Sequence, residues 1–168
     1  MLDFSRFSHL TFDCYGTLID WESGILSAVK PILGAHLNEV APDDEILDLY
    51  GVIEAEIEAG PYRRYREVLQ QVVRSLGGRF GFVPSVAECA SLPESLKEWL
   101  PFLDTKKSLR SLAARYKLVI VSNIDDDLMA STLPKLGVDF AEVITAEQAR
   151  SYKPSSNNFR IALERMGV

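Results

Sequence analysis

The sequence predicts an α/β fold in which a parallel sheet is interrupted, after its first strand, by a helical insert. Strand-forming runs at residues 9–12, 117–122 and 140–145 predict the strands of the sheet. Amphipathic helical segments follow the last two of these runs. The order of strands and helices implies parallel strands joined by right-handed crossovers. Residues 20–93 have helical periodicity and contain no convincing strand, which predicts the helical insert.

Composition restricts the class of protein before any motif is considered. The 168 residues are 47% apolar and 25% charged, which is typical of a globular enzyme or binding domain, and the net charge is -6. Basic runs are too short for a coherent basic face, so we expect no nucleic-acid partner. No apolar run has the length of a membrane span and no signal peptide is seen, so we expect a cytoplasmic protein without a membrane partner.

The cysteine and histidine content favours a protein without disulfides or zinc. Cys14 and Cys89 are too few for a disulfide framework and favour reduced thiols. The two histidines and two cysteines have no metal-type spacing, so we expect no zinc site.

Four helical segments are expected in the insert. Pro42, followed by three acidic residues, is typical of a helix start. Gly60 and Pro61 are expected to end that helix, and Gly77 and Gly78 to end the next one. The expected spans are approximately 20–36, 42–59, 62–76 and, for a helix or turn, 86–92.

Helices and strands alternate after the insert. Residues 117–122 contain four consecutive apolar residues, which suits a strand buried on both faces. Asp125 is expected to cap the following helix and Gly137 to end it, with Pro134 bending or shortening it. The expected helical spans are 106–116, 125–136, a single turn at 146–149, and 158–166.

Polar signals follow each of the three expected strands. Asp13 ends the first strand, Ser122 and Asn123 end the second, and Lys153 follows the third. Taken singly, each has an ordinary explanation as a loop or helix cap or as a surface lysine. The carboxyl ends of parallel strands meet at one edge of a sheet, where ligands bind, so the set predicts a shared pocket.

These motifs resemble those of the haloacid dehalogenase superfamily. Asp13-Cys-Tyr-Gly-Thr-Leu18 is similar to its first motif, which holds the nucleophilic aspartate, and Ser122-Asn123 and Lys153-Pro154 are similar to its second and third. The resemblance implies a Rossmann-like core made of residues 1–18 and 100–168. It also implies a helical cap inserted at residues 19–99, with the last core strand or strands missing.

Tyr15 favours one chemistry of this superfamily over another. Its phosphatases carry a second aspartate at this position, which protonates the alkoxide leaving group. A tyrosine hydroxyl, with an ordinary pKa of about 10, does not readily do so near neutral pH, whereas a halide needs no proton. The pattern Asp-x-Tyr-Gly-Thr-Leu also resembles that of the type II (S)-2-haloacid dehalogenases. We therefore expect a hydrolase that cleaves the carbon–halogen bond of a small (S)-2-haloacid.

Two alternatives stay open. One is a Mg²⁺-dependent phosphatase of the same superfamily, and the other is a catalytically weak or inactive binding module. Under the dehalogenase interpretation we expect a small-molecule substrate and no metal or cofactor, and Mg²⁺ is expected only for the phosphatase.

The resemblance implies a role for each motif residue. Asp13 would displace halide to form an ester that water then hydrolyses, and Lys153 would keep Asp13 ionised. Hydrogen bonds to the nucleophile or to the substrate carboxylate would come from the remaining motif residues. These expected binding residues are Tyr15, Thr17, Ser122 and Asn123.

The resemblance is incomplete in the cap and after the motif lysine. Gly51 stands where the dehalogenases carry an arginine for the leaving halide. That arginine is either replaced by a cluster made of Arg63, Arg64 and Arg66, or this cluster forms a solvated helix face. Phe159 stands where an aromatic hydroxyl usually follows the lysine.

The family's fourth acidic motif has no counterpart before Val168. The acids 125–127 are better explained as a helix cap and first-turn residues. Without the strand of the fourth motif, one edge of the first strand would be apolar and unpaired, and such edges pair with other chains. We therefore expect either a truncated chain or a homo-oligomer, most simply a dimer, that covers this edge.

Overall fold

The computed structural model describes residues 3–168 and divides the chain into two compact units. The sheet unit consists of Met1–Asp20 and Leu100–Val168, and the helical unit consists of Trp21–Trp99. None of the helices described between residues 3 and 168 is long and apolar enough to cross a membrane.

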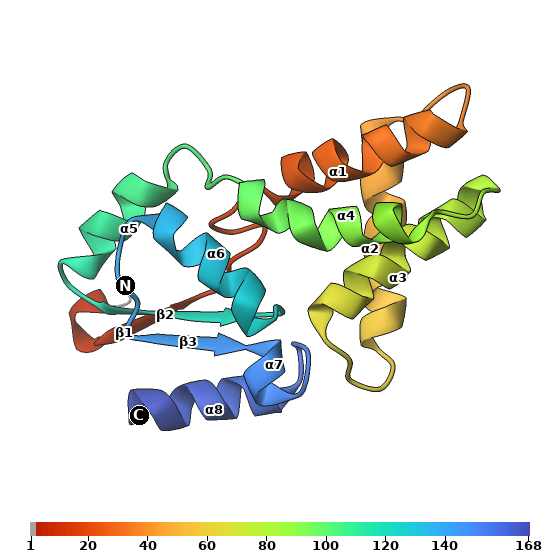
Figure 1. The fold of residues 1–168 in the computed structure, drawn as a ribbon. Helices are drawn as coiled ribbons and strands as arrows, with labels where there is room; N and C mark the ends of the chain where they lie inside the picture. The colour runs from red at the N-terminus through yellow and green to blue at the C-terminus, as the bar shows by residue number, and fades with distance from the viewer. Residues whose placement is uncertain (1–2) are drawn as a thin grey trace. The chain divides into compact units, whose positions relative to one another are not determined.

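The sheet unit contains a parallel sheet of three strands in the order β1-β2-β3 (Figure 1). The strands are β1 (His9–Phe12), β2 (Lys117–Ser122) and β3 (Glu142–Thr145). His9 pairs with Lys117, and Val119 pairs with Glu142. The central strand β2 is buried from its second residue onward, which its apolar run requires. The predicted α/β class is confirmed, and in the described sheet β1 is paired along one edge.

Helices cover both faces of this sheet. On one face lie α5 (Thr105–Ala113) and α6 (Asp126–Leu136), and on the other lies α8 (Ser156–Met166), after the short α7 (Ala146–Ala149) (Figure 1). Val119, Val121 and Ile144 of the sheet form one core cluster with Ala162 of α8. A short 3-10 turn, η1 (Phe4–Arg6), precedes β1 and was not predicted.

The helical unit contains four α-helices and a final 3-10 turn, η2 (Leu96–Glu98). Helix α3 packs against both α2 and α4, and α1 packs against α4 and α2. Ser85 and Glu88 form a reciprocal capping box at the start of α4, which fixes where that helix begins. The helices are α1 (Trp21–His36), α2 (Asp43–Glu58), α3 (Tyr65–Phe80) and α4 (Val86–Ser95).

The expected end of the third helix was wrong. Gly77 and Gly78 lie inside α3, which continues to Phe80 and ends at Gly81, where φ is 83°. Such a left-handed conformation favours glycine. A Cβ at Gly77 would lie 2.5 Å from Cδ of Pro84, so this glycine allows a close approach and does not stop the helix.

Pro134 does not end α6 either, because the helix runs on to Leu136 and stops at Gly137, where φ is 70°. Several further boundaries differ from those expected by two or three residues. Helix α3 begins at Tyr65, α4 ends at Ser95, α5 ends at Ala113, β3 begins at Glu142 and α8 begins at Ser156.

Candidate active site

A tight loop after β1 holds Asp13 and Thr17 close together. The Cys14 carbonyl accepts hydrogen bonds from the backbone N–H groups of Leu18 (2.7 Å) and Ile19 (3.0 Å). Gly16 makes the turn with a φ of 92°, a conformation that costs glycine little. As a result, the Thr17 hydroxyl donates to Oδ2 of Asp13 at 3.1 Å.

Lys153 joins the ends of β1 and β2 through its ammonium group. Nζ donates to Oδ1 of Asp13 at 2.6 Å and to the carbonyl of Val121 at 2.8 Å. The Lys153 side chain is 20% exposed and that of Asp13 is 42% exposed, so the pair lies at the surface of the sheet unit and the carboxylate remains accessible. The expected convergence of the first and third motifs is present in the geometry.

Asn123 positions the backbone of Lys153. Its Oδ1 accepts from the Lys153 N–H at 2.7 Å, and its Nδ2 donates to the Lys153 carbonyl at 3.3 Å. Its carboxamide is thus hydrogen-bonded to the loop that carries the lysine.

Ser122 is buried at the end of β2, and among residues 3–168 its hydroxyl has no hydrogen-bond partner. The expected roles of Ser122 and Asn123 in substrate binding stay predictions.

The Tyr15 hydroxyl lies 2.8 Å from Oγ1 of Thr132, a buried residue of α6. Burial is the main cause that raises the pKa of Tyr15 above its ordinary value, so this phenol is a weaker acid than a free one. Burial also raises the pKa of the neighbouring Cys14 thiol to about 12. Neither group is therefore a ready proton donor or thiolate nucleophile at neutral pH.

Asn158 and Thr132 belong to this arrangement, and the sequence reasoning missed both. Asn158 is fully buried, and its carboxamide bonds both the hydroxyl and the carbonyl of Ser151 at 2.9 Å, two residues before Lys153. Asn157 adds a bond from Nδ2 to the carbonyl of Ala149 at 2.6 Å. Two adjacent asparagines at the start of a helix were the available signal, because asparagine favours helix starts and turns.

The positions at which the chain departs from the family's motifs lie in α2, in and just before α3, and in α8. Arg66 pairs with Glu94 of α4 at 2.5 Å, whereas Arg63 and Arg64 are exposed in the segment before α3. Phe159 is half exposed on α8. A Cβ added at Gly51 of α2 would meet no atom within 4 Å.

The acids after the second motif have structural contacts. Asp125 stands at the expected N-cap position of α6, but its side chain makes no capping hydrogen bond there. Asp126 accepts hydrogen bonds from Thr145 and Gln148, each at 2.7 Å. Among residues 3–168, no group of three or more His, Cys, Asp or Glu side chains is placed to hold a metal ion.

The family model of the haloacid dehalogenase-like hydrolases matches residues 7–168. No curated protein matches. The L-2-haloacid dehalogenase from Xanthobacter autotrophicus is similar in structure, with a TM-score of 0.82 and 22% identity over 97% of this chain and 66% of that one. This chain therefore spans just under two thirds of that enzyme's length.

Two further solved structures have the same fold. The Xanthobacter autotrophicus enzyme with chloropropionic acid covalently bound matches with a TM-score of 0.79 and 22% identity, over 97% of this chain and 66% of that one. The defluorinating L-2-haloacid dehalogenase Rha0230 matches with a TM-score of 0.80 and 20% identity, over 96% of this chain and 69% of that one. At these identities the likeness establishes the fold.

Proposed function

Because this chain belongs to the haloacid dehalogenase-like hydrolase family, we propose that it hydrolyses the carbon–halogen bond of a small (S)-2-haloacid. The observation that carries the proposal is Tyr15, two residues after Asp13. Its hydroxyl is bonded to Thr132 and its pKa is raised by burial. Such a group is a poor acid for an alkoxide leaving group but is compatible with a halide, which leaves without a proton.

The proposed reaction has two steps. In the first, a carboxylate oxygen of Asp13 attacks the α-carbon of the haloacid, the carbon–halogen bond breaks, and halide leaves with its electron pair. In the second, water adds to the ester carbonyl, which releases the 2-hydroxyacid and a proton and regenerates Asp13. The net reaction consumes one water and yields one halide ion and one proton.

The contacts around Asp13 support nucleophilic attack through positioning. Lys153 holds Oδ1 and Thr17 holds Oδ2, so the carboxylate is fixed in one orientation before substrate arrives. Each oxygen keeps a further lone pair, because a carboxylate oxygen accepts more than one hydrogen bond. The role proposed for Ser122, at the buried end of β2, is a hydrogen bond from its hydroxyl to the substrate carboxylate.

The phosphatase alternative would require a proton donor and a Mg²⁺ site at this edge of the sheet. Tyr15 stands at the position of the expected donor and does not supply it readily. The covalently bound chloropropionic acid of the Xanthobacter autotrophicus structure is consistent with an ester step on this fold in that enzyme. Its transfer to Asp13 is part of the proposal.

The test measures halide release from (S)-2-chloropropionate, in parallel with phosphate release from p-nitrophenyl phosphate with Mg²⁺. We expect halide release that is lost in Asp13→Ala. A single turnover in H₂¹⁸O should place the label in the Asp13 carboxylate, detected by mass spectrometry of the peptide. Metal-dependent phosphate release would support the phosphatase, and inactivity in both assays from a folded protein would support the binding module.

A further inference from the structure

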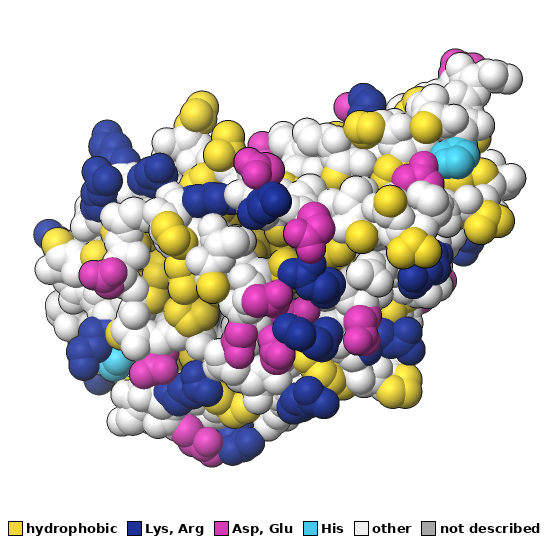
Figure 2. Space-filling view, viewed as in Figure 1, with side chains coloured by type: hydrophobic (Ala, Val, Ile, Leu, Met, Phe, Trp, Pro, Cys, Tyr) yellow, Lys and Arg dark blue, Asp and Glu magenta, His cyan; other side chains and the backbone are white. Residues whose placement is uncertain are grey.

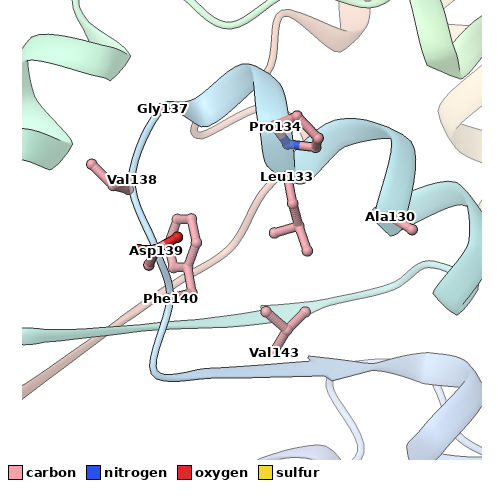
Figure 3. A pocket seen from close by; sticks show the side chains of 8 residues that line it. All are labelled: Ala130, Leu133, Pro134, Gly137, Val138, Asp139, Phe140 and Val143. Carbon is pink, nitrogen blue, oxygen red and sulfur yellow. The ribbon is translucent and has the colours of Figure 1, made fainter.

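An apolar hollow lies in the sheet unit between α6 and β3, distinct from the residues of the Asp13 site. Its volume is about 620 Å³, within the range of small-molecule sites. Leu133 of α6 and Val143 of β3 point toward each other across it, and Pro134 of α6 also lines it (Figure 3). The loop from Gly137 to Phe140 closes one end, before the amino end of β3, whereas Asp13 follows the carboxyl end of β1.

Two cationic side chains of α5 lie against this loop. A Cβ added at Gly137 would be 3.6 Å from Nη2 of Arg110 and 3.9 Å from Cδ of Lys106, so both side chains reach the backbone that lines the hollow. Neither makes a hydrogen bond or ion pair with any residue in the described part of the chain. Figure 2 shows dark-blue side chains over α5 and yellow side chains gathered below α6.

One residue at the edge of the hollow carries a negative charge. Asp139 is exposed on the same loop, and it also makes no hydrogen bond or ion pair within residues 3–168. Arg110 and Lys106, which lie against Gly137, and Asp139 on the loop are thus two cations and one anion, with a net charge of +1. An apolar floor beside these charges is complementary to a molecule with a hydrocarbon chain and one negative charge.

We propose that this hollow binds a medium-chain aliphatic carboxylate, with its head group at Arg110 and Lys106 and its chain over Leu133 and Val143. Burial of the chain supplies most of the affinity, and the two cations select the charge. Asp139 limits the affinity because it repels the head group. The site does not depend on the chemistry proposed for Asp13.

The experiment titrates the full chain with sodium decanoate, followed by amide chemical shifts and by calorimetry. We expect saturable binding with shifts centred on residues 130–143. Octanoate, which has two methylenes fewer, should bind about tenfold more weakly. Decylammonium, which has the same chain length and the opposite charge, should bind more weakly than decanoate.

Charge variants test the orientation of the ligand. Arg110→Gln should weaken decanoate binding about threefold to tenfold, and Asp139→Asn should strengthen it about twofold. Arg79→Gln, an exposed change of equal charge in the helical unit, should leave binding unchanged. Melting temperatures of all three variants should stay close to that of the parent.

Several results would overturn the proposal. These are equal affinity for decanoate and decylammonium, unchanged binding in Arg110→Gln, or shifts that map outside residues 130–143. If Leu133→Gln lowered the molar mass in solution without changing decanoate affinity, the occupant of the hollow would be a second copy of the chain and the proposal would be wrong.

Discussion

The two units use their partly buried polar side chains differently. In the sheet unit, Asn123 bonds the backbone of Lys153, and the Lys153 ammonium holds the Asp13 carboxylate, which remains accessible. In the helical unit, Glu54 of α2 accepts hydrogen bonds from the hydroxyls of Tyr65 (2.5 Å) and Tyr50 (2.9 Å), and burial raises the pKa of Glu54. The first arrangement orients an accessible carboxylate, and the second joins two helices. Changes in the sheet unit should therefore alter activity most, and changes in the helical unit should alter stability most.

The largest effect is expected from Lys153→Met, which removes the cation at 2.6 Å from Asp13. Under the proposed function, halide release should fall by about a thousandfold, because a preorganised charged donor is lost from the reacting carboxylate. Lys117→Met removes an exposed lysine from the same unit and should keep full activity. A loss below tenfold in Lys153→Met would contradict the proposed role.

The next largest effect is expected in the helical unit, from Gly24→Ala in α1. A Cβ there would lie 2.4 Å from Cδ2 of the buried Trp99 ring, so the ring or the helix must shift. The free energy of unfolding should fall by about 2–3 kcal/mol, measured with urea. Gly34→Ala is the matched control on the same helix, since its nearest contact would be an ordinary 3.7 Å to Val40. Equal stabilities for the two variants would contradict this packing.

The sequence predicted most of the elements because local signals decide them. The buried run of β2, the left-handed stop at Gly137 and the acidic start of α2 each act within a few residues. Gly77 was misinterpreted because a glycine that ends a helix and one that admits Pro84 look the same in sequence.

The candidate site was predictable in part, for a related reason. Strand-end positions grouped Asp13 with Lys153, but the partners that orient the site come from distant segments. Thr132 is 117 residues from Tyr15, and Asn123 is 30 residues from the backbone of Lys153 that it clamps. The direction in which a side chain turns at the end of a strand depends on such contacts, and hydrophobic periodicity does not encode it.

A moderate effect on stability, together with a change in the pKa of Tyr15, is expected from Thr132→Val. The change keeps the volume of the buried side chain but removes its hydrogen bond to Tyr15, which should cost about 1–2 kcal/mol in urea unfolding. This bond lowers the pKa of Tyr15, so its loss should raise that pKa further in an absorbance titration. Thr132→Ser retains the hydroxyl and should restore the parent titration curve. A curve identical to the parent in Thr132→Val would show that the bond is absent in solution.

Glu54 gives a smaller effect that depends on pH. Burial raises its pKa in the folded state above the ordinary value, so the folded protein binds the proton more tightly than the unfolded chain. The resulting contribution to stability is complete below pH of about 4.5 and is lost as the pH rises through the raised pKa. Glu54→Gln should remove this loss, so its stability relative to the parent should increase as the pH rises from 4.5 to 7. Glu56→Gln, on an exposed face of the same helix, should run parallel to the parent, and parallel curves for Glu54→Gln would contradict the prediction.

The smallest effect is expected from Gly51→Ala in the interior of α2. A Cβ there meets no atom within 4 Å, so the substitution changes no packing within the described structure. It restricts the unfolded chain and should raise the free energy of unfolding by about 0.5–1 kcal/mol in urea. Gly51→Arg should give a similar gain. If an arginine at this position takes up halide, it should also increase halide release, which Gly51→Ala should not. A loss of stability in Gly51→Ala that grows with protein concentration would show that a second chain packs against α2 at Gly51, as the expected homo-oligomer would allow.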